Sequence, residues 1–430
     1  MVIKKTKEYT SILYNILWMF FDKIFLLALN MLVVVRIANH FGSMIYGTYQ
    51  YAANVVAIFE VFVVFVDSRV VKKRYIDEEH NYIVWNATIT RVIFSVIAMI
   101  LGALYILVVG ENNEYKYIFT LLLINVILNN LRFGIQTRYE YLLKSKKIIV
   151  VADLFAALGG GLQLFAISLD SPIVVISFIT MCSSLMSLLI VYFQYVKDFG
   201  RNSNIRISRT LILELIKESA PLAVAASCAV IYSRCDAIMI GNLLTKSEVG
   251  VYDVAVKMIS VMQMAISPIR ESVYPKMIEL YNENKIEYEK KYVWVTTLLT
   301  WICIIGAFGS IIVLPFAMRI LKPEYSEALS IYHIYVIGAF FMYNAGLRAG
   351  HFTLINCGKV LMYSQVTSVI INIVLNYYLI NRLGVYGAAI ATVVTQAFSL
   401  FVSNLFFGTR GREVLKWQLK GLNPMNLFSK

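Results

Sequence analysis

The sequence is dominated by apolar runs of 20 or more residues that recur from one end of the 430-residue chain to the other. A transmembrane helix needs about 20 mainly apolar residues, whereas the elements of a soluble domain alternate apolar with polar positions. Only 15% of the residues are charged, against about 25% in ordinary globular proteins. We therefore expect an all-α integral membrane protein with no appended globular catalytic domain.

Hydropathy over a window of about 19 residues predicts twelve membrane-spanning helices. Their centres lie near Phe25, Val56, Val96, Ile124, Ala157, Ser183, Ala229, Met262, Ile305, Ala339, Ile370 and Val394. Three lysines precede the first apolar run, as in a signal peptide, but the run lacks a small-residue cleavage site. It is therefore expected to remain in the protein as the first span.

The distribution of positive charge predicts the orientation of these spans. Alternate loops carry 27 Lys and Arg residues on one side and five on the other. Because positively charged loops resist translocation, this bias places both termini in the cytoplasm. The same bias accounts for the net charge of +13, so the charge does not indicate nucleic-acid binding.

A short motif, G-x-Y-x-x-A, occurs twice. It opens the second predicted span at Gly47 and the eighth at Gly250, 203 residues later. An offset of six spans predicts two pseudo-symmetric six-helix lobes of the same orientation. The expected organisation is an N-terminal lobe (1–198), a cytoplasmic linker (199–216), a C-terminal lobe (217–408) and a basic cytoplasmic tail (409–430), in which Arg410 to Lys420 is expected to form an interfacial anchor helix.

Charged residues inside the predicted spans are the candidate functional residues, because each basic residue costs about 2.5 to 3.5 kcal/mol at a helix centre. The basic ones are Lys23, Arg36, Arg91, Arg132, Arg234, Lys257 and Arg270, and the acidic ones in or beside spans are Asp22, Glu60, Asp67, Asp153, Asp236, Asp253 and Glu271. Those near span ends have the alternative of snorkelling to the interface, as for Arg36, Arg132 and Arg270.

Spacing separates the remaining charges. Asp253 and Lys257 are four residues apart and are expected to pair along one helix face. Arg234 and Asp236 are two apart, so a regular helix points them in different directions, and at least one needs a partner on another helix. Lys23, Arg91 and Arg234 remain as basic groups without an evident local partner, which suits the binding of an anion.

Motifs of enzymes are missing from the sequence. No G-x-x-x-x-G-K-[ST] phosphate-binding loop occurs, so no ATPase motif is present. The four histidines and five cysteines show no metal-ligand spacing, and the cysteines are expected to be reduced packing residues. We therefore expect a transporter with no catalytic residues, no metal site and no cofactor.

Five stretches resemble one known family. They are Arg36 to Ala52, Lys217 to Pro221 (K-E-S-A-P), Arg234 to Gly241 (R-C-D-A-I-M-I-G), Val249 to Ala255 (V-G-V-Y-D-V-A) and Asn372 to Thr392, which includes Gly387-Ala388-Ala389. In order and spacing they resemble the polysaccharide transporters, or Wzx-type O-antigen flippases. That family belongs to the superfamily that also contains multidrug and toxin extruders (MATE) and lipid-linked oligosaccharide flippases.

The resemblance implies a MATE-like fold in a bacterial cytoplasmic (inner) membrane. It implies that polyprenyl-diphosphate-linked oligosaccharide repeat units, of an O-antigen or a related surface polysaccharide, move from the cytoplasmic to the outer leaflet by alternating access. Polysaccharide polymerase and chain-length machinery are the implied partners, with the lipid bilayer.

In this family the first, second, seventh and eighth helices line a central cavity. The implied diphosphate-binding residues are Lys23, Arg36, Arg91, Arg234, Lys257 and Arg270, although Arg91 falls on the third span. The implied coupling or charge-balancing residues are Asp22, Glu60, Asp236 and Asp253.

Two alternatives stay open at this point. A multidrug or cation antiporter of the same superfamily would place unpaired acids, rather than bases, in the cavity. An integral-membrane polysaccharide polymerase or ligase would be expected to carry carboxylates on a sizeable outer loop, whereas the predicted outer loops are only a few residues long.

Overall fold

The computed structural model describes residues 2–76, 79–142, 144–200, 206–264 and 266–427, without the side chains of residues 2–27, 264, 266–268, 270–272, 275 and 358–360. These residues form helices and turns, with no β-strand among them. The first half contains α1 (Val2–Val63), α2 (Ser68–Arg74), α3 (His80–Val108), α4 (Asn113–Leu131), α5 (Phe133–Tyr141), α6 (Lys146–Ser168) and α7 (Ile173–Phe199). The second contains α8 (Arg209–Leu243), α9 (Lys246–Met264), α10 (Ile266–Glu283), α11 (Lys285–Met318), α12 (Glu327–Leu354), α13 (Gly358–Leu383), α14 (Val385–Leu400) and α15 (Gly408–Lys420), with 3-10 turns at Pro323–Tyr325, Val402–Phe407 and Pro424–Leu427.

The predicted spans agree with these helices. Nine helical stretches of the described residues are long and apolar enough to cross a membrane, and they contain nine of the twelve predicted centres. The other three centres, Phe25, Val56 and Met262, lie in α1 and α9. Helix α1 holds two of them because the chain turns inside it at Gly42, whose φ of 76° glycine adopts without strain. The all-α membrane fold is confirmed.

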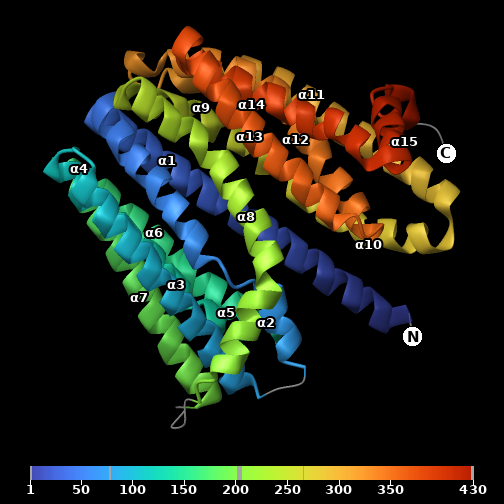
Figure 1. Cartoon of the computed structure of the whole chain (residues 1–430), viewed down its shortest axis with the longest axis horizontal. Coiled ribbons are helices and arrows are strands. Elements are labelled where there is room, and N and C mark those ends of the chain that lie inside the picture. The colour runs from blue at the N-terminus through green and yellow to red at the C-terminus, as the bar shows by residue number, and fades with distance from the viewer. Residues whose placement is uncertain (1, 77–78, 143, 201–205, 265, 428–430) are drawn as a thin grey trace.

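The helices form two groups, one from each half of the chain (Figure 1). Helices α3, α4, α6 and α7 make the N-terminal lobe, and α9 and α11 to α14 make the C-terminal lobe. Helices α1 and α8 lie between the groups and contact both. The groups lie closest together at the end where α1 turns, here called the hairpin end, and diverge toward the end with α2, the α10–α11 turn and α15, here called the basic end (Figure 1).

The repeated motif closes the hairpin end. Gly47 of α1 and Gly250 of α9 meet where the two helices cross, and a Cβ on either one would overlap backbone atoms of the other helix. Beside this crossing, the hydroxyls of Ser43 and Ser247 share a hydrogen bond of 2.7 Å. Lys246 Nζ lies 3.1 Å from Glu111 Oε1, an ion pair between the lobes. The motif glycines therefore permit direct backbone packing between the two lobes.

Helix α8 connects the lobes. At its start, the Ser208 N–H donates to Asn86 Oδ1 over 2.8 Å, and Arg74 pairs with Glu214 at 3.0 Å. Its first turns are thus held by the N-terminal lobe, while its later turns pack on α9 and α13. Helix α8 begins at Arg209, inside the predicted linker. The boundaries at residues 199 and 216 therefore stay a prediction.

Candidate functional site

Arg234 lies where the two lobes meet. It belongs to α8, its side chain is exposed, and its Nη1 donates to Asn54 Oδ1 of α1 over a long 3.3 Å. Glu60, six residues beyond Asn54 on α1, lies within electrostatic range of the guanidinium. Within the part of the chain that the structure describes, this arginine makes one long hydrogen bond inside a membrane span, which leaves most of its donors for another partner.

Arg91 has different surroundings. It is buried, its Nη2 donates to the Val66 carbonyl oxygen over 2.7 Å, and its Nη1 donates to Asn130. The guanidinium also lies 3.7 Å from the ring centroid of Phe133. These contacts fasten α3 to α4, α5 and the end of α1, which indicates a packing role. Binding of the diphosphate by Arg91 stays a prediction.

Lys257 is paired as its spacing predicted. Its ammonium contacts the Asp253 carboxylate four residues earlier on α9. The same carboxylate accepts a hydrogen bond from Tyr46 of α1, whose hydroxyl accepts one of 3.0 Å from Gln50. Asp253 therefore joins the two helices that carry the repeated motif, and Lys257 neutralises it.

Asp236 is a buried carboxylate held by neutral donors. Oδ2 accepts from the hydroxyls of Tyr252 at 2.7 Å and Tyr335 at 3.2 Å, and from Thr392. Oδ1 accepts from Asn376 Nδ2 at 2.6 Å. In the part of the chain that the structure describes, no basic side chain pairs with Asp236. A membrane-embedded acid that neutral groups surround is suited to binding a proton or a small cation.

The remaining predicted residues lie elsewhere. Arg36 is exposed on a groove of 670 Å³ with mainly apolar walls, between α1 and α6. It therefore does not join Arg234. The side chains of Lys23, Asp22 and Arg270 lie outside the described residues, so their roles stay predictions.

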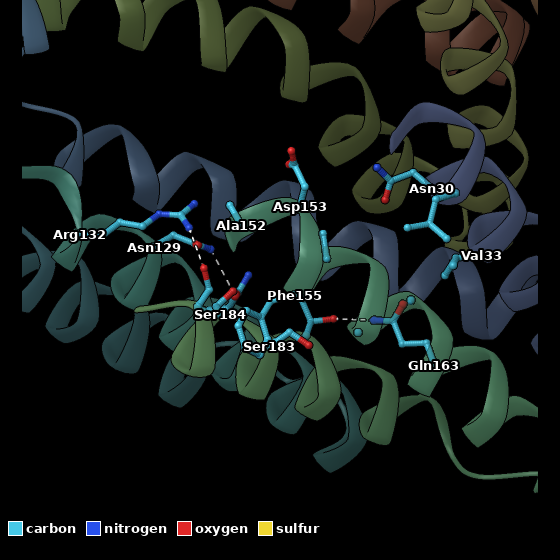
Figure 2. Close-up of a pocket in the computed structure, with 17 residues that line it drawn as sticks. Asn30, Val33, Asn129, Arg132, Ala152, Asp153, Phe155, Gln163, Ser183 and Ser184 are labelled. Carbon is cyan, nitrogen blue, oxygen red and sulfur yellow. Dashed lines mark hydrogen bonds between the residues drawn. The ribbon is translucent and has the colours of Figure 1, made fainter. Parts of the chain in front are cut away.

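The N-terminal lobe contains a polar cavity of 360 Å³ among α1, α4, α6 and α7 (Figure 2). Its polar lining consists of amide, hydroxyl and charged side chains: Asn30, Asn125, Asn129, Arg132, Asp153, Gln163, Thr180, Ser183, Ser184 and Ser187. Arg132 Nη1 donates to Ser187 over 3.3 Å, and Gln163 Nε2 to Thr180 over 2.8 Å. Such a density of polar groups between membrane spans indicates a site for a polar ligand.

Sequence reasoning noted two members of this site, Arg132 and Asp153, but did not assemble it. The available signal was helical spacing: Asn125, Asn129 and Arg132 recur every three or four residues along one face, as do Thr180, Ser184 and Ser187 of α7. Glycine also contributes, because a Cβ on Gly159 would overlap the Ser183 hydroxyl and push α6 from α7.

The fold and these embedded polar sites define a multi-pass membrane protein of the transporter class. A family model described as polysaccharide biosynthesis protein matches residues 12–281, more than half of the chain. The chain therefore belongs to this polysaccharide biosynthesis family, within the superfamily of extruders and flippases that its motifs predicted.

Similar proteins agree with this placement. A stretch of 170 residues is 24% identical to a probable low-salt glycan biosynthesis flippase, Agl15, of Haloferax volcanii; it covers 39% of this chain and only 36% of that protein. The lipid II flippase MurJ in an inward closed conformation has the same fold, with a TM-score of 0.69, 14% identity and coverage of 94% and 90% of the two chains. An inward-facing multidrug resistance MATE transporter gives a TM-score of 0.68, 15% identity and coverage of 91% and 95%.

Proposed function

We propose that this protein is a flippase for polyprenyl-diphosphate-linked oligosaccharide repeat units of an O-antigen or a related surface polysaccharide. It would move them from the cytoplasmic to the outer leaflet of a bacterial cytoplasmic membrane, as a transporter and not an enzyme. The observation that carries the proposal is the exposed Arg234, inside a membrane span and at the junction of the lobes. Family membership supports the class of substrate.

Arg234 is proposed to bind the diphosphate. A diphosphate cannot cross hydrocarbon without a replacement for its lost hydration, whereas its polyprenyl chain can stay in the lipid. The guanidinium fork matches two phosphate oxygens, and among the described residues Arg234 has one long hydrogen bond to give up. Glu60 and Asn54 would orient the fork from the neighbouring helix α1.

The polar cavity of the N-terminal lobe is proposed to bind sugar hydroxyls. Amide and hydroxyl side chains both donate and accept hydrogen bonds, as sugar hydroxyls do. Gln163, Asn129 and Ser184 line the cavity without a strong charge of one sign. This composition suits a neutral sugar better than a free anion or cation.

Asp236 is proposed to couple transport to a proton or a monovalent cation. Rocking of the two lobes would expose the bound head to one side and then the other, with the basic end and both termini in the cytoplasm. A diphosphate with two charges that crosses a potential of 100 mV would release about 4.6 kcal/mol, at about 2.3 per charge. Occupation of Asp236 would then reset the empty carrier. Polymerase and chain-length machinery would use the exported unit.

The second candidate is a multidrug or cation antiporter. The observation that favours it is the presence of two embedded carboxylates, Asp153 at the polar cavity and Asp236 in the C-terminal lobe. An organic cation would bind such acids directly, and Arg234 would then have no substrate to hold.

The test uses the purified protein in lipid vesicles with a polyprenyl-diphosphate oligosaccharide. The sugar that becomes accessible to an added glycosidase is measured with and without a membrane potential. We expect protein-dependent accessibility that Arg234→Ala abolishes and Arg234→Lys partly keeps. The matched control is Arg382→Ala, an exposed arginine at the hairpin end.

The other possible outcomes would support a different class of protein or a different role for Arg234. Efflux of a cationic dye without glycan movement would support the antiporter. A longer glycan product would support a polymerase. Equal glycan movement by wild type, Arg234→Ala and Arg234→Lys would remove Arg234 from the mechanism.

A further inference from the structure

A second cavity lies at the basic end of the C-terminal lobe, apart from the sites described above. It has a volume of 840 Å³ and lies between the α10–α11 turn, the end of α12 and helix α15. Its floor is aromatic: buried His351 shares a hydrogen bond of 2.7 Å with the Tyr288 hydroxyl, and the Trp417 ring lies 5.3 Å from the His351 ring. Side-chain contacts therefore fix the shape of the cavity floor.

Basic side chains surround this cavity. Four of them line it, Lys285, Arg410, Lys416 and Lys420, together with two acids, Glu289 and Glu413. Lys420 pairs with Glu289 at 3.2 Å. Within the described part of the chain, Arg410 and Lys416 have no carboxylate within ion-pair distance. The lining thus carries two more basic than acidic side chains, and among the described residues Lys285 also has no carboxylate within ion-pair distance.

Helix α15 holds these cations in place. Its inner face carries Gly411, Val414 and Gln418, all buried. A Cβ on Gly411 would overlap the Asn404 carbonyl oxygen, and Asn404 Nδ2 donates to Gln418 Oε1 over 2.9 Å. The helix is therefore docked on the lobe by close contacts, and Arg410, Lys416 and Trp417 project from it at fixed positions around the cavity.

The position of the cavity points to a lipid. It lies beside the ends of membrane spans, where tryptophan is typical of the headgroup level. Basic residues near an anionic membrane surface contribute about 1 kcal/mol each, and an arginine fork matches phosphate oxygens. A free phosphate ion needs neither a cavity of this volume nor an aromatic floor.

We propose that this cavity binds the headgroup of an anionic phospholipid, whose phosphate contacts Arg410 and Lys416 and whose glycerol region contacts Trp417. The shared chemistry is a phosphate group, which a lipid headgroup or free phosphate could supply. Neighbouring Lys285 adds to the positive field. The inference does not depend on the transport activity.

The test measures thermal unfolding of the full-length protein in a neutral detergent. Phosphatidylglycerol, phosphatidylcholine and inorganic phosphate are added separately. We expect phosphatidylglycerol to raise Tm by about 3–6 °C, phosphatidylcholine not to raise it, and phosphate to have a smaller effect. The double variant Arg410→Gln/Lys416→Gln should lose the phosphatidylglycerol shift. The matched control Arg319→Gln/Lys322→Gln, an exposed pair at the hairpin end, should keep it.

Equal shifts in the wild type and the Arg410/Lys416 double variant, or no shift in either, would overturn the proposal. A shift with inorganic phosphate as large as that with phosphatidylglycerol would replace the lipid with a free anion. If the double variant does not fold, the proposal is tested by quenching of the tryptophan fluorescence of the wild type. Brominated phosphatidylglycerol should quench it more than brominated phosphatidylcholine, and Trp417→Phe should remove the difference; equal quenching by the two lipids counts against the site.

Discussion

The two lobes both place polar side chains within the membrane, but they arrange them in opposite ways. In the N-terminal lobe the polar groups surround a cavity of 360 Å³. The hydrogen bonds among them include long ones, such as that from Arg132 to Ser187 at 3.3 Å. In the C-terminal lobe one group of them converges on a carboxylate, Asp236, which neutral donors enclose. The first arrangement leaves hydrogen-bonding capacity for a ligand, whereas the second stabilises one charge. This contrast predicts that mutations in the two clusters have different effects.

The largest expected effect is that of Asp236→Leu. The change removes the acceptor of the Thr392 hydroxyl and of at least one of the paired Tyr252 and Tyr335 hydroxyls, and each buried group left unsatisfied costs about 1–3 kcal/mol. We expect little monodisperse protein in size-exclusion chromatography. Asn129→Leu in the N-terminal cavity is the control and should elute as the wild type. A normal Asp236→Leu profile would contradict the enclosed arrangement.

Asp236→Asn should separate folding from coupling. An asparagine keeps the shape and one acceptor oxygen, so we expect a folded protein with a lower Tm. Because it carries no charge, glycan movement should lose its dependence on an imposed proton or sodium gradient. The measurement is glycosidase accessibility in vesicles with and without each gradient. Unchanged gradient dependence would remove Asp236 from the coupling mechanism.

Arg91 and Arg234 offer a paired test within one kind of residue. Arg91→Ala removes hydrogen bonds from a charged donor to Asn130 and to the Val66 carbonyl, each worth about 1.5–3 kcal/mol. We expect a marked fall in Tm. Arg234→Ala should leave Tm unchanged and abolish glycan movement. The reverse pattern would exchange the roles assigned to the two arginines.

The N-terminal cavity should respond in transport and not in stability. Gln163→Leu removes a donor that sugar hydroxyls would use and is expected to lower the rate about tenfold, the equivalent of about 1.4 kcal/mol. Tm should stay unchanged, and a substrate with a single sugar should be less affected than the full repeat unit. Asn381→Leu, an exposed amide at the end of α13, is the control. An equal loss for both substrates would argue against sugar binding here.

The smallest expected effect is that of Tyr335→Phe. It removes the 3.2 Å hydrogen bond to Asp236 and the contact with the Tyr252 hydroxyl, and it keeps the ring packing. The stability should fall by about 1 kcal/mol, with gradient dependence retained. Thermal unfolding and the vesicle assay measure the two quantities. A fall as large as that of Asp236→Leu would mean that the hydroxyl, rather than the carboxylate, organises the cluster.

Features that depend on near neighbours in the sequence were predictable. Apolar runs located the spans, and a spacing of four residues identified the Asp253–Lys257 pair. The motif glycines indicated the repeat, because a helix crossing at backbone contact requires glycine on both sides. Each of these features follows from periodicity or from a local steric requirement.

Features that depend on distant residues were not predictable in the same way. The donors to Asp236 come from α9, α12, α13 and α14, up to 156 residues away. No spacing rule relates them. Arg91 illustrates the converse, since its partners Asn130 and Val66 lie on other elements and made it look unpartnered in the sequence. The serines and asparagines of the N-terminal cavity are common residues whose convergence only the fold reveals.

The crossing of Gly47 and Gly250 has a consequence for the energy of the proposed alternating access. Two backbones in direct contact bring no long side chains whose rotational freedom would be lost on closing and regained on opening. The polar contacts around the crossing, such as Ser43 with Ser247 and Lys246 with Glu111, add to the apolar packing of α1 on α9 in holding the hairpin end closed. Each contributes on the order of 1 kcal/mol. In the proposed alternating access, a ligand would shift this balance only by the difference between its free energies of binding to the two states.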